Sequence, residues 1–249
     1  MSTPTSTQAL RASPSWLTAA LVVAVMCAMI GAGFGDGETI DAWHWLHWLC
    51  KPLATILVIA MVWSVRLPVS PTYRQRVLAG MVFSLVGDVF LMLSPRWFIA
   101  GLLGFLIAHV GFIAAFVSDK PFAAKPLPWL LCVAYGALAV WMLWPSLAPV
   151  LRFAVPLYIA VLATMAGQAV GRAGWFRARC ATLAPQAVLA ACGALVFMLS
   201  DSLLAWNRFM APLPLSAVAV LGTYYAALWL IARSVDASTT LPTTQGIER

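Results

Sequence analysis

Eight long apolar runs, separated by short connections that contain proline and charged residues, dominate this chain of 249 residues. A helix needs about 20 apolar residues to cross the roughly 30 Å hydrocarbon core of a bilayer, and the runs approach that length. The composition agrees, because 63% of the residues are hydrophobic, only 9% are charged and the mean hydropathy is +0.92. The sequence therefore predicts an all-α membrane protein, a single bundle of eight transmembrane helices at residues 16–34, 51–66, 77–93, 98–117, 129–147, 150–170, 185–205 and 214–233.

The first run has some features of a secretory signal. Arg11 precedes it and the small residues GAGFG close it, yet it extends from Trp16 to Phe34 and lacks an A-x-A cleavage pattern. A usual signal core has only about 7 to 15 residues, so we expect a retained helix. The predicted organisation is a short cytoplasmic tail at 1–15, a transmembrane domain at 16–233 and a flexible cytoplasmic tail at 234–249.

Lysine and arginine are distributed unevenly over the two sides of the predicted bundle. Eleven of the 15 fall on the side that carries both termini, and the others are Lys51, Arg96, Arg152 and Arg208. Positively charged loops stay in the cytoplasm, so both termini are expected there, in the inner membrane of a bacterium. The basic face suits anionic lipid headgroups. No run of basic residues forms, which gives no support to nucleic-acid binding.

Cysteine and histidine give no clear metal site. The cysteines at 27, 50, 132, 180 and 192 show no C-x-x-C spacing and fall mostly within predicted spans, so neither a disulfide nor a metal is assigned to them. His44 and His47 in DAWHWLHWLC could meet a metal on one helical face, but no third ligand is evident. Because histidine and tryptophan both suit the headgroup region, an interfacial aromatic segment is the favoured interpretation.

Three ionisable residues lie well inside predicted spans: Asp88, in the stretch LVGDVFLML, His109 and Asp201. Such a residue at the centre of a membrane helix costs about 2.5 to 3.5 kcal/mol on insertion scales and generally serves function. The structural alternative is that a buried aspartate caps a helix or bonds a neighbouring one. For His109 a purely structural role and a functional role are equally favoured.

The two aspartates share a local pattern. Each lies about two thirds of the way across a span that starts on the cytoplasmic side, and each follows a small residue, Gly87 or Ser200. Each also has a glycine eight positions earlier. Small residues allow helices to approach closely, so the two carboxyl groups are expected to face each other across a tight interface. Their separation of 113 residues, four spans along the chain, hints at duplication of a four-helix unit.

Two carboxyl groups close together in a low-dielectric site cannot both ionise easily, so one is expected to keep its proton while the other stays charged. Such an acid/base pair suits a reaction that begins with protonation, passes through a cation and ends with the addition of water, as in glycosidases. The substrate of such a site would be a molecule that resides in the bilayer.

Several sequence elements resemble the YhhN-like lysoplasmalogenases, multi-pass membrane proteins that cleave the vinyl ether of lysoplasmalogens. The elements are KPLATILVI at 51, FSLVGDVFLML at 83, FIAGLLGFLIAHVGFIAAF at 98, LSDSLLAWNRF at 199 and GTYYAALWLIA at 222. The GD element and the later SD-x-x-x-A-x-N-x-F element, in separate helices and in this order, carry most of the resemblance. Leu228 departs from it, because many members have a polar glutamine there.

The resemblance implies hydrolysis of a 1-alkenyl glycerophospholipid that lacks its second acyl chain, giving a fatty aldehyde and glycerophosphoethanolamine or glycerophosphocholine. One of Asp88 and Asp201 would donate a proton to the vinyl ether, and the other would stabilise the resulting oxocarbenium ion and orient water. Which aspartate has which role stays open at this point. This chemistry needs no cofactor and no metal, and the sequence signals neither.

Seven further residues are candidates for binding the substrate or for tuning the aspartates: Lys51, Ser84, His109, Asn207, Arg208, Tyr224 and Tyr225. Lys51 or Arg208 could hold the phosphate, with ordinary snorkelling of an interfacial cation as an equal alternative. His109 or Ser84 could bond an aspartate, although a serine in a membrane helix more often bonds its own i−4 carbonyl, and Asn207 could end its helix. The tyrosines could place a phenol in the site. For the histidine, the serine and the tyrosines alike, helix packing is slightly favoured.

Two other functions compete with the hydrolase. A proton-coupled small-molecule transporter would use Asp88, Asp201 and His109 as a relay, but it would also need discontinuous helices and inverted repeats, whereas the repeat hint is parallel. A structural scaffold would tolerate Asp→Asn at both positions. The hydrolase is preferred, with a lysophospholipid and membrane lipids as partners, and the sequence predicts no particular oligomeric partner.

Overall fold

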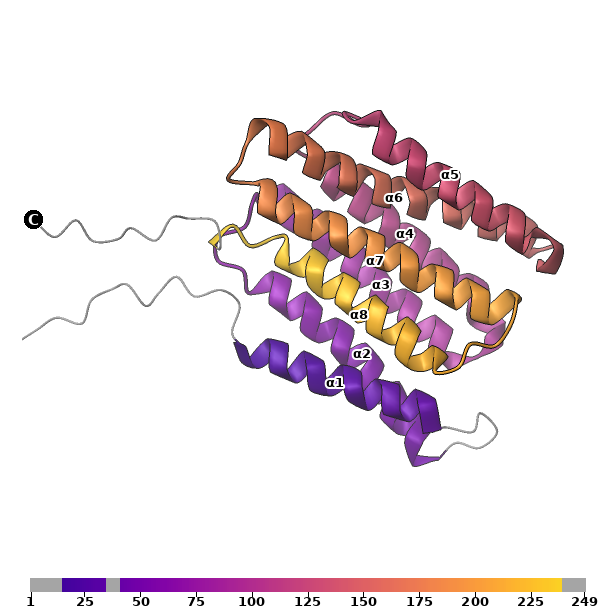
Figure 1. Cartoon of the computed structure of the whole chain (residues 1–249). Helices are drawn as coiled ribbons and strands as arrows, with labels where there is room; N and C mark the ends of the chain where they lie inside the picture. The colour runs from indigo at the N-terminus through magenta and orange to yellow at the C-terminus, as the bar shows by residue number, and fades with distance from the viewer. Residues whose placement is uncertain (1–14, 35–40, 239–249) are drawn as a thin grey trace, which may run out of the picture.

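Residues 15–34 and 41–238 are described by the computed structural model of the chain. Within these ranges the chain forms eight helices that are long and apolar enough to cross a membrane (Figure 1). They are α1 Ser15–Phe34, α2 Ala42–Trp63, α3 Pro71–Leu93, α4 Phe98–Phe116, α5 Pro126–Leu143, α6 Leu151–Arg179, α7 Ala184–Phe209 and α8 Ser216–Arg233. Short 3₁₀ helices, η2 Pro95–Trp97 and η3 Trp144–Ser146, precede α4 and follow α5. The predicted all-α bundle of an integral membrane protein is confirmed.

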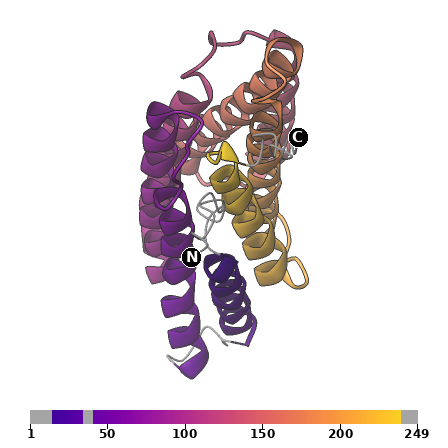
Figure 2. The same cartoon turned by 90° about the vertical axis from the view of Figure 1, so that its left-hand side faces the viewer.

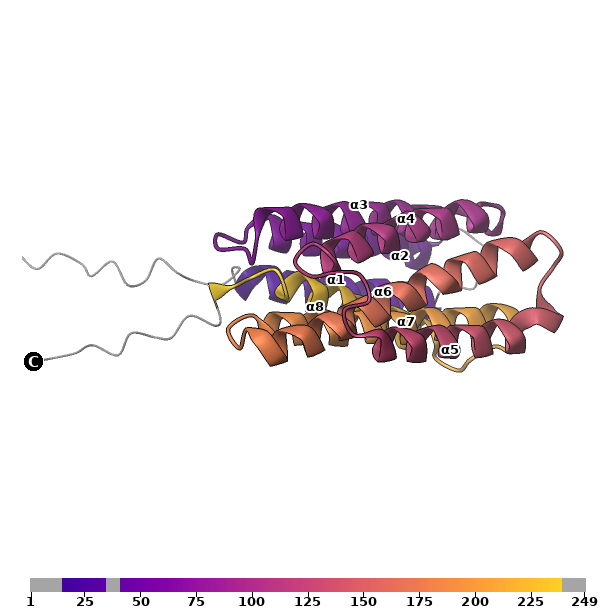
Figure 3. The same ribbon diagram turned by 90° about the horizontal axis from the view of Figure 1, so that it is seen from above.

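The helices run side by side and pack most closely as four successive hairpins, α1 with α2, α3 with α4, α5 with α6 and α7 with α8. Figure 3 shows α2, α3 and α4 along one side of the bundle and α5 and α7 along the other, with α6 crossing obliquely. Figure 2 shows the same separation from the end of the bundle, with α1 and α8 between the two sides. The two halves of the chain therefore meet where α4 contacts α6 and where α8 contacts α1 and α2.

α2 begins at Ala42, well before the predicted start at residue 51. Asp41 caps the helix, because its carboxylate accepts a hydrogen bond from the backbone N–H of His44 at 3.0 Å. A cap of this kind satisfies an amide that would otherwise lack a partner. The expected interfacial segment of histidine and tryptophan is therefore helical, and His47 Nδ1 lies 3.0 Å from the Ala28 carbonyl of α1.

α6 continues to Arg179, beyond its predicted end at residue 170. Arg172, expected in a loop, is completely buried. Its Nε and Nη2 donate to the Asp119 carboxylate at 3.0 and 2.5 Å, and its guanidinium lies 4.5 Å from the ring centroid of Tyr73. A bidentate ion pair compensates much of the cost of burying the charge, so the helix can extend through this position.

Glycines in α3 and α7 bring each helix against its hairpin partner. A Cβ on Gly87 would lie 2.5 Å from the Phe105 ring of α4, and a Cβ on Gly193 would lie 2.9 Å from the Ala227 carbonyl of α8. The predicted tight interface between the two helices that carry the aspartates is therefore wrong. The close approaches are α3 with α4 and α7 with α8, whereas α3 and α7 have little direct contact.

The described chain does not end with α8. The carbonyl of Val235 accepts a hydrogen bond from the backbone N–H of Val69, and the N–H of Ala237 donates to the Leu67 carbonyl, each at 2.9 Å. Gln186 Nε2 also donates to the carbonyl of Asp236 at 3.1 Å. Val235 and Ala237 therefore bond the α2–α3 connection and Asp236 bonds α7, so the chain directly after α8 is not the flexible tail that was predicted from residue 234. Residues 239–249 and 1–14 lie outside the described residues.

Candidate active site

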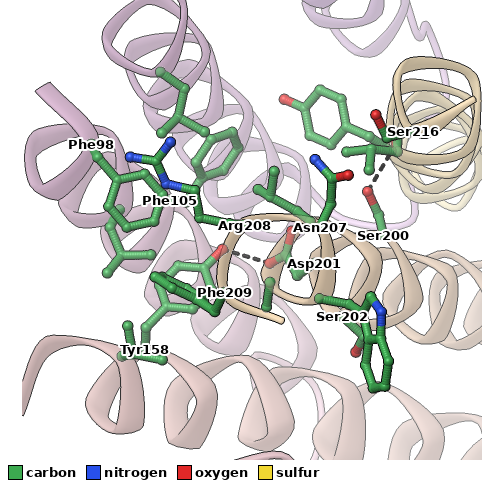
Figure 4. A pocket seen from close by; sticks show the side chains of 18 of the residues that line it. Phe98, Phe105, Tyr158, Ser200, Asp201, Ser202, Asn207, Arg208, Phe209 and Ser216 are labelled. Atoms are coloured by element: carbon green, nitrogen blue, oxygen red, sulfur yellow. Dashed lines mark hydrogen bonds between the residues drawn. The ribbon is translucent and has the colours of Figure 1, made fainter. Parts of the chain in front are cut away.

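A large cavity lies inside the bundle (Figure 4). Its volume is about 890 Å³, all eight helices contribute to its wall, and most of that wall is aliphatic or aromatic. The imidazole, charged, hydroxyl and amide side chains on it are His44, His47, Lys51, Asp88, Ser94, Tyr135, Tyr158, Ser200, Asp201, Ser202, Asn207, Arg208, Ser216 and Tyr224. An apolar pocket with a few converging polar groups is the usual form of a small-molecule site.

Asp88 lies on α3 and is almost completely buried. Its Oδ2 accepts hydrogen bonds from the hydroxyls of Thr55 and Tyr224, each at 2.7 Å. Its Oδ1 lies 3.5 Å from Nζ of Lys51. Donors from α2 and α8 thus converge on one carboxyl group, which is how an apolar helix keeps an acidic residue in its interior.

Tyr225 stands behind this cluster and does not line the cavity. Its hydroxyl donates to the Lys51 carbonyl at 2.6 Å and lies 3.4 Å from Oγ1 of Thr55. The side chain therefore joins α8 to α2. Of the two adjacent tyrosines, only Tyr224 presents a phenol to the cavity.

Asp201 lies on α7, and Figure 4 shows the Tyr158 hydroxyl of α6 directed at it. Tyr158 donates to Oδ2 at 2.5 Å. Oδ1 of Asp201 has no hydrogen-bond partner among the described residues, and no lysine or arginine among them pairs with this carboxyl group. Its side chain is 14% exposed, against 2% for Asp88. Asp201 is therefore the more accessible and the less compensated of the two.

His109 of α4 is completely buried behind Asp201 and does not line the cavity. Its ring centroid lies 5.2 Å from that of Tyr158 and 4.9 Å from that of Phe197. Its Nε2 is 4.0 Å from Oδ2 of Asp201, which is too long for a hydrogen bond. The expected bond from this histidine to an aspartate is therefore wrong, because the α4 backbone holds the ring too far away. Neither ring nitrogen has a hydrogen-bond partner within the described part of the chain.

The remaining candidates divide between the cavity and the helix interior. Asn207 and Arg208 line the cavity at the end of α7. The Asn207 side-chain oxygen accepts a hydrogen bond from the backbone N–H of Leu213 at 2.8 Å, which fixes the α7–α8 loop. The Arg208 guanidinium lies 5.2 Å from the ring centroid of Phe98. Figure 4 shows these two side chains next to each other.

Ser84 does not reach either aspartate. Its hydroxyl donates to the Gly80 carbonyl one turn earlier on α3, at 3.0 Å, and the residue does not line the cavity. The possible contact with Asp88 is therefore absent, and the alternative of a bond to its own backbone is confirmed. A serine in a membrane helix commonly bonds its own backbone in this way, because no water competes for the carbonyl.

Two residues of the site were not singled out by sequence reasoning. Thr55 lies one helical turn after Lys51, so the four-residue spacing that puts both on one helix face could have indicated it. Tyr158 lies 43 residues from Asp201 in a different helix. Its only sequence signal is a hydroxyl within an apolar span, and no local pattern pairs it with the carboxyl group.

The helices that contact the two aspartates correspond in the two halves of the chain, α1–α4 and α5–α8, although only Asp88 has a lysine beside it. Each lies on the third helix of its half and accepts a hydrogen bond from the second helix of the same half, α2 or α6. Each also faces the fourth helix of the other half, α8 or α4. This exchange of partners supports the duplication that the sequence hinted at.

The fold and the site together define a class, that of integral membrane proteins with two carboxyl groups on the wall of one largely apolar cavity. The chain belongs to the YhhN family, whose model matches residues 46–235 and so includes every helix except α1. All nine residues that the sequence marked as site candidates lie in this range. The expected family is confirmed.

Two named relatives illustrate the match. The chain is similar to human lysoplasmalogenase TMEM86A, with 31% identity over 190 residues that cover 74% of this chain and 75% of the relative. It is also similar to pig lysoplasmalogenase TMEM86B, with 37% identity over 112 residues that cover 44% of this chain and 40% of the relative. No solved structure matches the chain.

Proposed function

We propose that this protein is a lysoplasmalogenase, a hydrolase that cleaves the vinyl ether bond of 1-alkenyl lysophospholipids. The products are a fatty aldehyde and glycerophosphoethanolamine or glycerophosphocholine. The observation that carries the proposal is the placement of Asp88 and Asp201 on the wall of one apolar cavity within a membrane bundle. The relatives' names agree with this activity.

Two carboxyl groups are what this reaction requires. A vinyl ether is hydrolysed by slow protonation of its β-carbon, which forms an oxocarbenium ion that water then attacks. A positioned acid accelerates the first step, and an anion close to the developing cation lowers the barrier further. Asp88 and Asp201 supply both functions within one cavity.

The cavity suits a lipid with one chain. Its volume of about 890 Å³ is in the range of known small-molecule sites, roughly 300 to 1,000 Å³. α5 and α6 contribute mostly apolar side chains to its wall, and two of these, Leu138 and Met142, are exposed. These exposed apolar side chains support a place for the alkenyl chain, and a route in from the bilayer, beside α5.

We assign the phosphate to Arg208. This residue lines the cavity beside Phe98 and forms no ion pair with a carboxylate of the described chain. Lys51, the other candidate, has its ammonium 3.5 Å from Asp88. A guanidinium can bind a phosphate with two parallel hydrogen bonds, so the free arginine is the better anchor for the headgroup.

We place the protein in the bacterial inner membrane with both termini in the cytoplasm. The excess of lysine and arginine on the side that carries the termini supports this orientation. Arg208 and Lys51 then lie toward the outer leaflet, together with the two aspartates. The lysophospholipid would therefore be taken from that leaflet.

The helical structure around the aspartates gives no support to the alternative of a proton-coupled transporter. That alternative calls for broken helices at the binding site. α3 continues without interruption from Pro71 to Leu93 through Asp88, and α7 from Ala184 to Phe209 through Asp201. A continuous scaffold that fixes two carboxyl groups is what an acid/base enzyme needs.

The proposal is tested by incubating the purified protein in detergent, without added metal, with 1-alkenyl, 1-alkyl and 1-acyl lysophosphatidylethanolamine. We expect fatty aldehyde from the alkenyl lipid alone, because only a vinyl ether gives an oxocarbenium ion on protonation. A folded protein that releases no aldehyde, or one that instead hydrolyses the acyl ester, would contradict the proposal.

A further inference from the structure

We propose that Asp201 is the proton donor of this site, that Asp88 acts as its ionised partner and that Tyr158 is the positioning residue for Asp201. This inference rests on the proposed function, because it divides the catalytic work between the two carboxyl groups. It follows from the unequal partners that the two groups have.

The surroundings of Asp88 stabilise a negative charge. Both of its carboxyl oxygens are engaged, Oδ2 by the hydroxyls of Thr55 and Tyr224 and Oδ1 by the ammonium of Lys51 at 3.5 Å. Three donors, one of them a cation, compensate an ionised carboxylate within a low-dielectric bundle. A protonated Asp88 would leave the Lys51 ammonium buried without a counter-ion.

The surroundings of Asp201 stabilise the neutral acid. One uncharged phenol, that of Tyr158, donates to Oδ2, and no lysine or arginine of the described chain approaches the carboxyl group. His109, at 4.0 Å, lies among aromatic rings with no hydrogen-bond partner in the described residues for either nitrogen, so it offers no stabilised positive charge. A carboxyl group without a counter-charge in an apolar cavity keeps its proton.

Tyr158 also determines which oxygen of Asp201 carries that proton. Its hydroxyl donates to Oδ2, which must therefore be an acceptor, as the carbonyl oxygen of a carboxylic acid is. The proton then lies on Oδ1, the oxygen with no partner in the described residues, on a side chain that lines the cavity. The phenol thus directs the acidic hydroxyl toward the substrate.

The reaction uses only the lipid and one water molecule, and both carboxyl groups return to their starting protonation states. Asp201 transfers its proton to the β-carbon of the vinyl ether, the C=C π bond breaks, and an oxocarbenium ion forms beside the carboxylate of Asp88. Water adds to the cationic carbon and gives one proton to Asp88, which yields a hemiacetal. The hemiacetal hydroxyl then returns a proton to Asp201 as the aldehyde C=O forms. The glyceryl oxygen leaves with the proton from Asp88, which restores both groups.

Infrared difference spectroscopy tests this division without a substrate. The C=O stretch of a protonated carboxyl group is separate from the bands of a carboxylate, so spectra of the purified wild type at neutral pH are compared with those of Asp201→Asn and Asp88→Asn. We expect a protonated-carboxyl band in the wild type that persists in Asp88→Asn and disappears in Asp201→Asn. Its loss in Asp88→Asn, its persistence in both variants or its absence from the wild type would overturn the proposal.

Tyr158→Phe tests the positioning role. It also tests the proposal if one of the aspartate variants does not fold. We expect the same band to move to higher frequency, because the carbonyl loses a hydrogen bond, and kcat to fall by about tenfold with KM unchanged. Tyr73→Phe is the matched control, since its buried phenol bonds Ser234 far from the cavity. An unmoved band in Tyr158→Phe, or an equal shift in Tyr73→Phe, would contradict the assignment.

The infrared result and the aldehyde assay can fail separately. A protonated-carboxyl band that behaves as expected in a protein without hydrolase activity would disprove the proposed function alone. An active enzyme whose band belongs to Asp88 would disprove the division of roles alone.

Discussion

The bundle contains two buried groups of charged residues that are compensated in different ways. One is the aspartate site on the cavity. The other, here called the Arg172 cluster, consists of Tyr73, Asp119, Lys120, Gln168 and Arg172. Tyr73 precedes Asp88 by fifteen residues on α3, which places the two groups about 22 Å apart along the helix.

In the Arg172 cluster the cations are held by neighbouring protein groups. Arg172 donates to Asp119 through two nitrogens, and Lys120 Nζ donates to Oε1 of Gln168 at 2.8 Å. No residue of this cluster lines the cavity. At the aspartate site Asp201 keeps an oxygen with no partner in the described chain. The difference between the two groups is access to the cavity, which indicates that charge away from the cavity serves the fold, whereas the carboxyl groups on its wall serve chemistry.

Breaking the Arg172 cluster should give the largest loss of stability. Arg172→Met removes the completely buried guanidinium and its hydrogen bonds to Asp119, whose side chain is 24% exposed, so the free energy of unfolding should fall by about 2 kcal/mol. The exposed Arg96 provides a control, since Arg96→Met should change stability by less than about 0.5 kcal/mol. Thermal unfolding in detergent measures both. The comparison fails if Arg172→Met is as stable as the wild type.

Removing the cation beside Asp88 should impair catalysis more than folding. Lys51→Met takes away the positive charge 3.5 Å from Oδ1 of Asp88, so kcat for aldehyde release should fall by about 10- to 100-fold. Lys51→Arg keeps the charge and should recover part of the rate. Steady-state kinetics separate this role from phosphate binding. A rise in KM at unchanged kcat in Lys51→Met would show that the lysine holds the headgroup instead.

Arg208 should show the opposite kinetic pattern. Arg208→Met removes the proposed phosphate anchor at the end of the cavity, and KM for the lysophospholipid should rise about tenfold while kcat changes little. Inhibition by the product glycerophosphoethanolamine should weaken in parallel. A variant with wild-type KM would remove Arg208 from the binding site.

Lys120 should have no effect on catalysis, and its effect on stability should depend on pH. Burial lowers the pKa of Lys120 from its usual 10.5 to about 8. Between these values the unfolded chain binds more protons than the folded one, so the stability that Lys120 contributes rises with pH over that range. The thermal midpoint of the wild type relative to Lys120→Met should therefore increase from about pH 8 to pH 10. A constant or falling difference would contradict the direction of the shift.

The fold could be predicted from the sequence because apolar run length is a local property. The prediction of the fold was wrong where a contact between residues far apart in the sequence made it possible to bury a charge or decided which helices pack together. Arg172 was assigned to a loop, since a lone arginine ends an apolar run unless a carboxylate neutralises it, and that carboxylate lies 53 residues away. Gly87 and Gly193 correctly indicated close packing, but a glycine does not specify which helix it will face.

The site could be predicted only in part, because the sequence shows which residues are unusual in an apolar span but not which residues they contact. An aspartate in an apolar span is rare and costly, so Asp88 and Asp201 could be recognised singly. Their partners could not, because contact depends on the rotation of each helix about its axis. That rotation leaves His109 4.0 Å from Asp201 and presents Tyr158 to the carboxyl group.

The most direct test of the account is aldehyde release from 1-alkenyl lysophosphatidylethanolamine by Asp88→Asn and Asp201→Asn beside the wild type, with folding verified by thermal unfolding. Each substitution preserves the size of the side chain and one acceptor oxygen but removes the acid or the base. We expect the rate to fall by about 10³-fold or more in both folded variants. A rate close to that of the wild type in either variant would show that its carboxyl group belongs, as in the Arg172 cluster, to the fold and not to the chemistry.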